Sequence, residues 1–165
     1  MSGCKEERMA LRRDGGIASG SGQPAKDGRA KTRKRILIVD DEPDIRLTLR
    51  MLLEHRGYQV EEAEDGAAAR ARLGAGTFDL MILDLLMPSL SGEDVIRRLS
   101  KERRERMPVI MLTAKGRDED MREGYALGSS YYITKPFKNQ RIVDAAEYLI
   151  GDGTPAERAV LELRL

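Results

Sequence analysis

The sequence contains no tryptophan, and aromatic residues of all kinds make up only 4% of its 165 residues. A chain of this length corresponds to about one domain of ordinary size. Because 41% of the residues are hydrophobic, the chain can form one core, and that core must be aliphatic. There is also a single cysteine, Cys4, which excludes an internal disulfide and fits a reducing compartment.

Long apolar segments are missing as well. The longest runs, such as Leu80–Leu83 and Val109–Leu112, are far too short to span a bilayer. The first twenty residues are rich in charge and contain no apolar stretch of signal-peptide length. We therefore expect a soluble, cytoplasmic protein without membrane insertion.

Charge is unevenly distributed, although the formal net charge is only +1. Residues 1–35 hold 10 Lys and Arg against 4 Asp and Glu, which leaves the remainder mildly acidic. Residues 1–34 are also rich in Gly and Ser, and such a segment predicts a disordered basic arm. Its cluster Arg29–Arg35 has no interleaved aromatics for base stacking, so a solvated linker is favoured over nucleic-acid binding.

From Arg35 onward, short apolar runs alternate with segments of helical periodicity. The first expected helix has Asp41 as its candidate N-cap and Pro43 in its first turn, and Gly57 as its stop. The expected strands are 36–39, 58–63, 78–83, 108–112 and 131–134, and the other expected helices are 66–73, 92–99, 118–127 and 139–150. We expect one domain over residues 35–150, followed by a tail, 151–165, that could add a helical turn or two.

Five strand–helix units in alternation predict an α/β fold, with a doubly wound parallel sheet and helices on both faces. In such a sheet, ligands bind beyond the carboxyl ends of the strands. The residues expected at those ends are chemically distinctive, and we expect them to converge on one edge: Asp40, Asp41, Asp84, Thr113 and Lys135.

Three carboxylates in one pocket repel one another unless their pKa values rise or a cation is present. A site with only oxygen ligands favours a hard ion such as Mg²⁺, which also holds phosphate oxygens. Lys135 and Thr113 could bind the phosphoryl group, and one carboxylate could be its acceptor. Ordinary helix caps and turn residues are the alternative explanation, but five such residues at strand ends favour a site.

Four segments of the sequence carry a resemblance to a known family. The chain resembles the receiver domain of two-component response regulators, over about residues 35–150. The segments that carry the resemblance are Ile36–Glu42, Asp79–Pro88, Leu112–Ala114 and Tyr132–Phe137. This resemblance implies a flavodoxin-like (βα)5 fold with strand order 2-1-3-4-5.

The resemblance also implies the roles of the acidic residues. Asp84 corresponds to the phosphoacceptor, and the expected cofactor is Mg²⁺. Asp41 and Asp84 correspond to direct Mg²⁺ ligands, Asp40 to a ligand through water, and Leu86 to the donor of a backbone carbonyl.

Further roles are implied for residues of the last two strands. Lys135 would pair with the phosphoryl oxygens, and its peptide bond to Pro136 would be cis. Thr113 would be the switch hydroxyl, and Tyr132 the ring that moves with it. That movement would repack the face around the fourth helix, the fifth strand and the fifth helix.

Some positions depart from the family pattern. Ser130 and Tyr131 stand where the family usually has small and acidic residues, which changes the expected output surface. Leu86 and Lys115 occupy positions that tune the lifetime of the phosphoryl group, and the sequence does not predict that lifetime.

The resemblance implies a histidine kinase or histidine phosphotransfer protein as donor and a downstream protein as target. Only fifteen residues follow Ile150, so we expect a stand-alone receiver that is not a turnover enzyme; a phosphorylation-dependent homodimer stays open. One alternative is a protein-binding module of the same fold that does not depend on phosphorylation. Another is a Mg²⁺-dependent phosphohydrolase, which needs a second acid that Leu85 and Leu86 do not supply.

Overall fold

The computed structural model describes residues 33–88, 91–114 and 130–162 of the chain, all within the unit Thr32–Leu165. Three predictions therefore lie outside the described residues. They concern the disordered arm, of which only residues 33 and 34 are described, the helix over 118–127, and Lys115.

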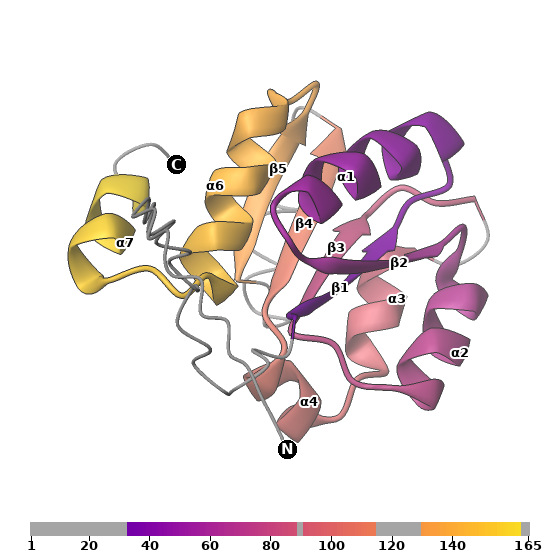
Figure 1. Ribbon diagram of the computed structural model, residues 1–165. Coiled ribbons are helices and arrows are strands. Elements are labelled where there is room, and N and C mark those ends of the chain that lie inside the picture. Colours follow the sequence, from indigo (N-terminus) through magenta and orange to yellow (C-terminus); the bar gives the residue numbers. More distant parts are fainter. Residues whose placement is uncertain (1–32, 89–90, 115–129, 163–165) are drawn as a thin grey trace, which may run out of the picture. The chain divides into compact units, whose positions relative to one another are not determined.

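One parallel sheet of five strands forms the centre of this unit (Figure 1). The strand order is β2-β1-β3-β4-β5, which confirms the predicted order and the predicted fold class. The strands are β1 (Arg35–Val39), β2 (Gln59–Ala63), β3 (Leu80–Asp84), β4 (Val109–Ala114) and β5 (Tyr131–Lys135). Compared with the predicted ranges, β3 starts later and β4 runs further, to Ala114.

The unbroken apolar runs are explained by burial of the sheet on both faces. Successive side chains of a strand point to opposite faces, so such a run supplies two cores at once. Ile36 and Ile38 belong to the core beneath α1 and α6, while Leu37 and Val39 belong to the core beneath α2 and α3. All four side chains are fully buried.

The two long helices cover one face of the sheet and contact each other (Figure 1). They are α1 (Pro43–His55) and α6 (Asn139–Ile150). Leu49 and Leu53 of α1 and Ile142 of α6 are fully buried, as expected for apolar residues at helical spacing. After α1, Gly57 has a φ of 89°, which glycine adopts without steric cost, so the predicted stop is confirmed.

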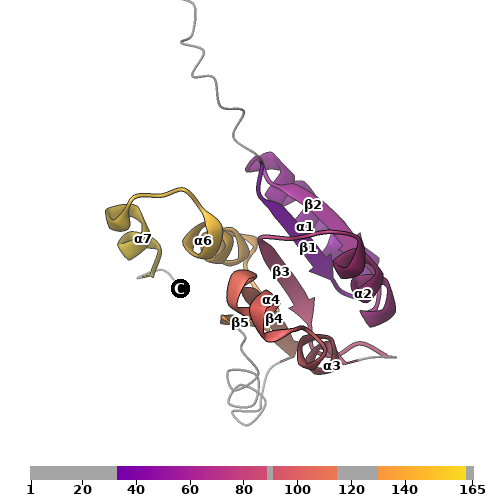
Figure 2. The ribbon, with the colours of Figure 1, turned by 90° about the horizontal axis from the view of Figure 1, so that it is seen from below.

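The remaining helices are shorter: α2 (Gly66–Ala75), α3 (Gly92–Arg97), α4 (Lys101–Arg106) and α7 (Pro155–Glu162). The prediction of one helix over 92–99 was wrong at its end, because α3 stops at Arg97 and α4 follows as a separate helix. Ser100 caps α4 by accepting a hydrogen bond from the Arg103 amide at 3.3 Å. In the tail, α7 lies beside α6 on the side away from β1 (Figures 1 and 2).

The start of α1 also differs from the prediction. The N-cap residue is Glu42, and no side chain caps the helix, so the prediction of Asp41 as N-cap was wrong. Instead, Asp40 accepts a hydrogen bond from the Glu42 amide at 2.9 Å. The acidic loop is therefore shaped by Asp40, which leaves the Asp41 side chain exposed.

Candidate functional site

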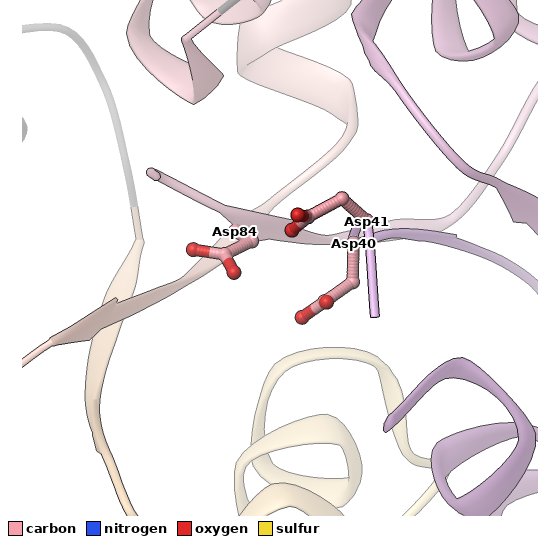
Figure 3. Close-up of side chains that lie close together, drawn as sticks. All are labelled: Asp40, Asp41 and Asp84. Carbon is pink, nitrogen blue, oxygen red and sulfur yellow. The ribbon is translucent and has the colours of Figure 1, made fainter. Parts of the chain in front are cut away.

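Three aspartates meet at the carboxyl ends of β1 and β3. Carboxylate oxygens of Asp40, Asp41 and Asp84 all lie within 4.8 Å of one another. Figure 3 shows the three side chains close together, with the carboxylate of Asp41 directed toward Asp84. Asp40 and Asp84 are buried, with 0% and 4% exposure, while Asp41 is exposed, so the group is reached from solvent on one side.

The strand register explains why two of these acids are neighbours. Val39 of β1 pairs with Leu83 of β3, so Asp40 and Asp84 each follow a paired residue. Each aspartate also lies two residues after an isoleucine, Ile38 or Ile82, that faces α1 and α6, so both aspartates are expected on that face of the sheet. Burial raises the pKa of Asp40, more than the hydrogen bonds from Glu42 and Lys135 lower it.

Lys135, at the end of β5, is the cation of the site. Its Nζ lies 2.6 Å from Asp84 Oδ2, 3.0 Å from Asp40 Oδ2 and 3.2 Å from Glu42 Oε1. Burial alone would lower the pKa of Lys135, but the hydrogen bonds and charges of Asp84 and Asp40 raise it above its ordinary value. The ammonium therefore stays charged and offsets part of the repulsion among the carboxylates.

Two residues that the sequence reasoning did not assign to the site help to shape it. Glu42 brings a third carboxylate to Lys135 from the exposed rim, beside those of Asp40 and Asp84. Arg46, one turn into α1, donates from Nη1 to the carbonyl oxygens of Asp40 at 2.7 Å and Asp41 at 3.0 Å. Arg46 follows Asp41 by five residues and therefore lies in the first turn of the predicted helix. That position was the signal by which sequence reasoning could have found it.

The loop after β3 fixes the Asp84 side chain. Asp84 Oδ1 accepts a hydrogen bond from the Leu86 amide at 2.9 Å, which places the Leu86 backbone beside the carboxylate. The Gly92 amide donates to the Leu85 carbonyl at 3.2 Å. A Cβ at Gly92 would overlap the backbone carbonyl of Asp84, so only glycine allows α3 to start this close.

Thr113 and Tyr132 lie on the neighbouring strands β4 and β5, of which β4 pairs with the strand that carries Asp84. Thr113 is 8% exposed, and its hydroxyl donates to the Ala114 carbonyl at 3.1 Å. Tyr132 pairs with Met111, and its ring belongs to the core beneath α2 and α3. Alternation along β4 places Thr113 on that same face as Met111, so the hydroxyl and the ring are diagonal neighbours.

The structure thus brings Asp40, Asp41, Asp84 and Lys135 together, while Thr113 and Tyr132 lie on the neighbouring strands β4 and β5. The peptide bond between Lys135 and Pro136 is cis. Of the two residues that depart from the family pattern, Ser130 is exposed, whereas Tyr131 is half-buried against the core beneath α1 and α6.

The donor set fits a hard divalent cation. All of its ligand atoms are oxygens, and Mg²⁺ is usually bound through one or two carboxylates while it keeps several waters. Two buried carboxylates and one exposed carboxylate provide such a set, with one side open to water and to an incoming phosphate.

In open α/β sheets, ligands bind beyond the carboxyl ends of the strands, and the acidic pocket of this chain lies there. Residues 36–147, more than half of the chain, match the family model described as "Response regulator receiver domain". The chain belongs to this family, whose members are signalling modules that interact with histidine kinases or phosphotransfer proteins and bind Mg²⁺ at an acidic pocket.

Named relatives agree with this assignment. The transcriptional regulatory protein ResD of Bacillus subtilis is 42% identical over 109 residues, which are 66% of this chain and 45% of that protein. The phosphate regulon transcriptional regulatory protein PhoB of Escherichia coli is 42% identical over 111 residues, which are 67% of this chain and 48% of that protein. The match therefore spans about half the length of these relatives.

Solved structures with the same fold align with this chain over almost their whole length. The chemotaxis response regulator CheY4 of Vibrio cholerae aligns with a TM-score of 0.67 and 30% identity, over 72% of this chain and 100% of that chain. The response regulator protein TrrA of Thermotoga maritima, in complex with Mg(2+)-BeF, aligns with a TM-score of 0.62 and 32% identity, over 71% and 99%.

No helix within the described residues is long and apolar enough to cross a membrane.

Proposed function

We propose that this chain is a phosphorylation-switched receiver that accepts a phosphoryl group on Asp84 in a Mg²⁺-dependent reaction. The donor is the phosphohistidine of a sensor histidine kinase or a histidine phosphotransfer protein. The observation that carries the proposal is the buried Asp84 carboxylate, held by Lys135 at 2.6 Å within 4.8 Å of two further aspartates.

Two hydrogen bonds hold the Asp84 carboxylate in place before it attacks the phosphoryl donor. The Leu86 amide donates to Oδ1, and the Lys135 ammonium donates to Oδ2, so the carboxylate is fixed in position. An Asp84 oxygen attacks phosphorus, the P–N bond of the phosphohistidine breaks, and the histidine leaves with the electron pair of that bond. As the acyl phosphate forms, Asp84 loses its negative charge, and Lys135 exchanges this partner for an oxygen of the phosphoryl group.

Mg²⁺ would be held by Asp41 and Asp84 directly, by Asp40 through water, and by the Leu86 carbonyl. When bound, it supplies positive charge that neutralises both the carboxylates and the phosphoryl oxygens. Asp41 is the exposed member of the set and is therefore the ligand that meets an incoming ion first.

The output step follows from the pair Thr113 and Tyr132. A phosphoryl group adds charge and acceptor oxygens, so the Thr113 hydroxyl exchanges the Ala114 carbonyl for a phosphoryl oxygen. The Tyr132 ring is already buried here, so movement of Thr113 would change the packing around this ring. The signal would then pass through the surface around β5 and α6 to a downstream protein.

A phosphohydrolase mechanism receives no support from the loop after Asp84. Leu85 is buried and Leu86 is exposed, and neither offers a proton for a leaving group. The phosphoryl group would therefore stay on the protein until water removes it slowly, and the chain is not a turnover enzyme on an external substrate.

Intact mass spectrometry after brief incubation with a small-molecule phosphodonor and Mg²⁺ tests the proposal. We expect one added phosphoryl group in the wild type, and none in Asp84→Asn or in wild type without metal. Absence of the adduct from folded wild-type protein would favour the phosphorylation-independent binding module instead.

A further inference from the structure

At the amino ends of β1, β3 and β4, opposite to the acidic pocket, the structure contains a second cavity. Its volume is about 730 Å³, and it is lined by residues 33–35, residues 77–79 and five residues between Ser100 and Met107. Figure 1 shows α4, which supplies part of this lining, at the lower end of the sheet. The basic residues of the lining are Arg33, Lys34, Arg35, Arg103 and Arg106.

Two of these five cations already have acidic partners. The ammonium of Lys34 lies 4.0 Å from Asp79, and Arg35 Nη2 lies 2.5 Å from Glu61. Asp79 also accepts a hydrogen bond from the Arg35 amide at 2.8 Å. These contacts tie the start of β1 to its neighbours and leave little of their charge for a ligand.

The other three cations, Arg33, Arg103 and Arg106, have no ion-pair partner among the residues that the structure describes. Arg103 donates from Nη1 to the Leu73 carbonyl, which is a neutral group and fixes the guanidinium without cancelling its charge. The remaining acid of the lining, Glu102, is exposed, so the lining holds two acids against five basic residues. The cavity therefore has an excess of positive charge.

The inner wall of the cavity is apolar and firmly packed. Phe78 and Met107 are 8% and 2% exposed, and the Arg35 guanidinium lies 4.7 Å from the centre of the Phe78 ring. An apolar floor with a few charged groups around it is the usual make-up of a small-molecule site, and such sites have volumes of roughly 300–1,000 Å³. Arginine is suited to phosphate because its planar fork donates two parallel hydrogen bonds.

We propose that this cavity binds a small molecule that carries a chain of phosphate groups, such as a nucleoside triphosphate. The phosphates would lie against Arg33, Arg103 and Arg106, and the rest of the ligand against the apolar floor. The site is separate from Asp84, because a five-residue strand rises about 3.3 Å per residue and so puts roughly 16 Å between the two ends. The proposal therefore goes beyond the phosphorylation of Asp84 and does not depend on it.

Isothermal titration calorimetry of the full chain with ATP and with inorganic pyrophosphate tests this site. The buffer contains EDTA, because without a metal ion the carboxylates at the opposite end repel the same ligands. We expect both to bind the wild type, more weakly as salt is added. The variant Arg33→Gln with Arg106→Gln should weaken binding by about tenfold or more, since each charge-assisted hydrogen bond contributes over 1 kcal/mol.

Arg70→Gln is the matched control, because Arg70 is equally exposed on α2 but does not line the cavity. We expect it to bind ATP within about twofold of the wild type, as surface charges contribute little at a distance. Equal weakening by Arg70→Gln would overturn the proposal and indicate diffuse attraction to positive charge. So would no heat from either ligand at millimolar concentration.

Discussion

The two ends of the central sheet differ in charge although the same strands build both. At the carboxyl end, Asp40 and Asp84 are buried around one lysine, and Asp41 remains open to solvent. At the amino end, the described lining has five basic residues against two acidic ones. The strands β1, β3 and β4 that join the two ends are apolar and buried over most of their length, so each end can hold its own chemistry without disturbing the core.

The two ends also differ in how far their charges are buried. At the acidic end, two carboxylates are buried and paired with Lys135, so loss of that lysine should lower the stability strongly. The basic end is half open, and solvent screens its charges, so single changes there should have small effects on stability. The following predictions test this contrast, from the largest expected effect to the smallest.

The largest effect is expected from Lys135→Met, which leaves two buried carboxylates without their cation. Breaking a buried ion pair costs about 3–5 kcal/mol, and the 18% exposure of the Lys135 side chain places this case near 3 kcal/mol. Chemical denaturation at pH 7 in EDTA measures the loss, and Mg²⁺ should restore part of it.

The matched control for that variant is Lys138→Met, since Lys138 is exposed and has no contact with the acids. It should change the free energy of unfolding by less than about 0.5 kcal/mol. If Lys135→Met proved as stable as the wild type in EDTA, the acidic end would not depend on its lysine.

Gly92→Ala should be next in size. The new Cβ overlaps the Asp84 carbonyl, and overpacking of this kind costs about 1–3 kcal/mol. Gly74→Ala makes the same change in α2 where nothing lies within 4 Å, and there alanine should stabilise by about 0.5–1 kcal/mol. Opposite signs in thermal unfolding would confirm the close approach at Gly92, and equal signs would refute it.

Asp41→Asn should weaken Mg²⁺ binding by about tenfold or more while it leaves the fold intact, because this carboxylate is exposed. The chain has no tryptophan, so calorimetry is the suitable measurement. Asp44→Asn, an exposed acid in the first turn of α1, serves as control and should bind Mg²⁺ like the wild type. An unchanged affinity in Asp41→Asn would remove Asp41 from the metal site.

The smallest effect concerns Glu61, which links β2 to the basic end. Hydrogen bonds from Arg35 and Arg72 lower its pKa from the ordinary value of 4.5. A lowered carboxyl pKa adds stability above pH 4.5 that is lost as the pH falls through the folded-state value. Glu61→Gln should therefore cost less than about 1 kcal/mol at pH 7 and nothing near pH 2, and a difference that grows in acid would contradict this.

The sequence predicted the parts of the fold that rest on simple patterns. Buried runs such as Ile36–Val39 and the apolar stripe of Asn139–Ile150 repeat with the period of their element, so both were placed correctly. The break between α3 and α4 was missed because the charged run after Arg97 continues a helical composition. Ser100, the cap, was the local signal that could have revealed it.

The candidate site was predictable only where residues follow strands directly. Asp40, Asp84 and Lys135 each end a strand, and the parallel topology brings them together. Glu42 and Arg46 were missed because their contacts depend on side-chain reach around the first turn of α1, which strand ends do not determine. The same cause made Asp41 a wrong choice of N-cap.

The most direct test of the central claim is to locate the phosphoryl group chemically. Wild-type protein is incubated with a phosphodonor and Mg²⁺, reduced with borohydride, which converts an aspartyl phosphate to homoserine, and mapped by peptide mass spectrometry. The account predicts homoserine at position 84 and unmodified aspartate at positions 40 and 41. Homoserine at either of those two positions, or at none of the three in protein that has gained a phosphoryl group, would contradict it.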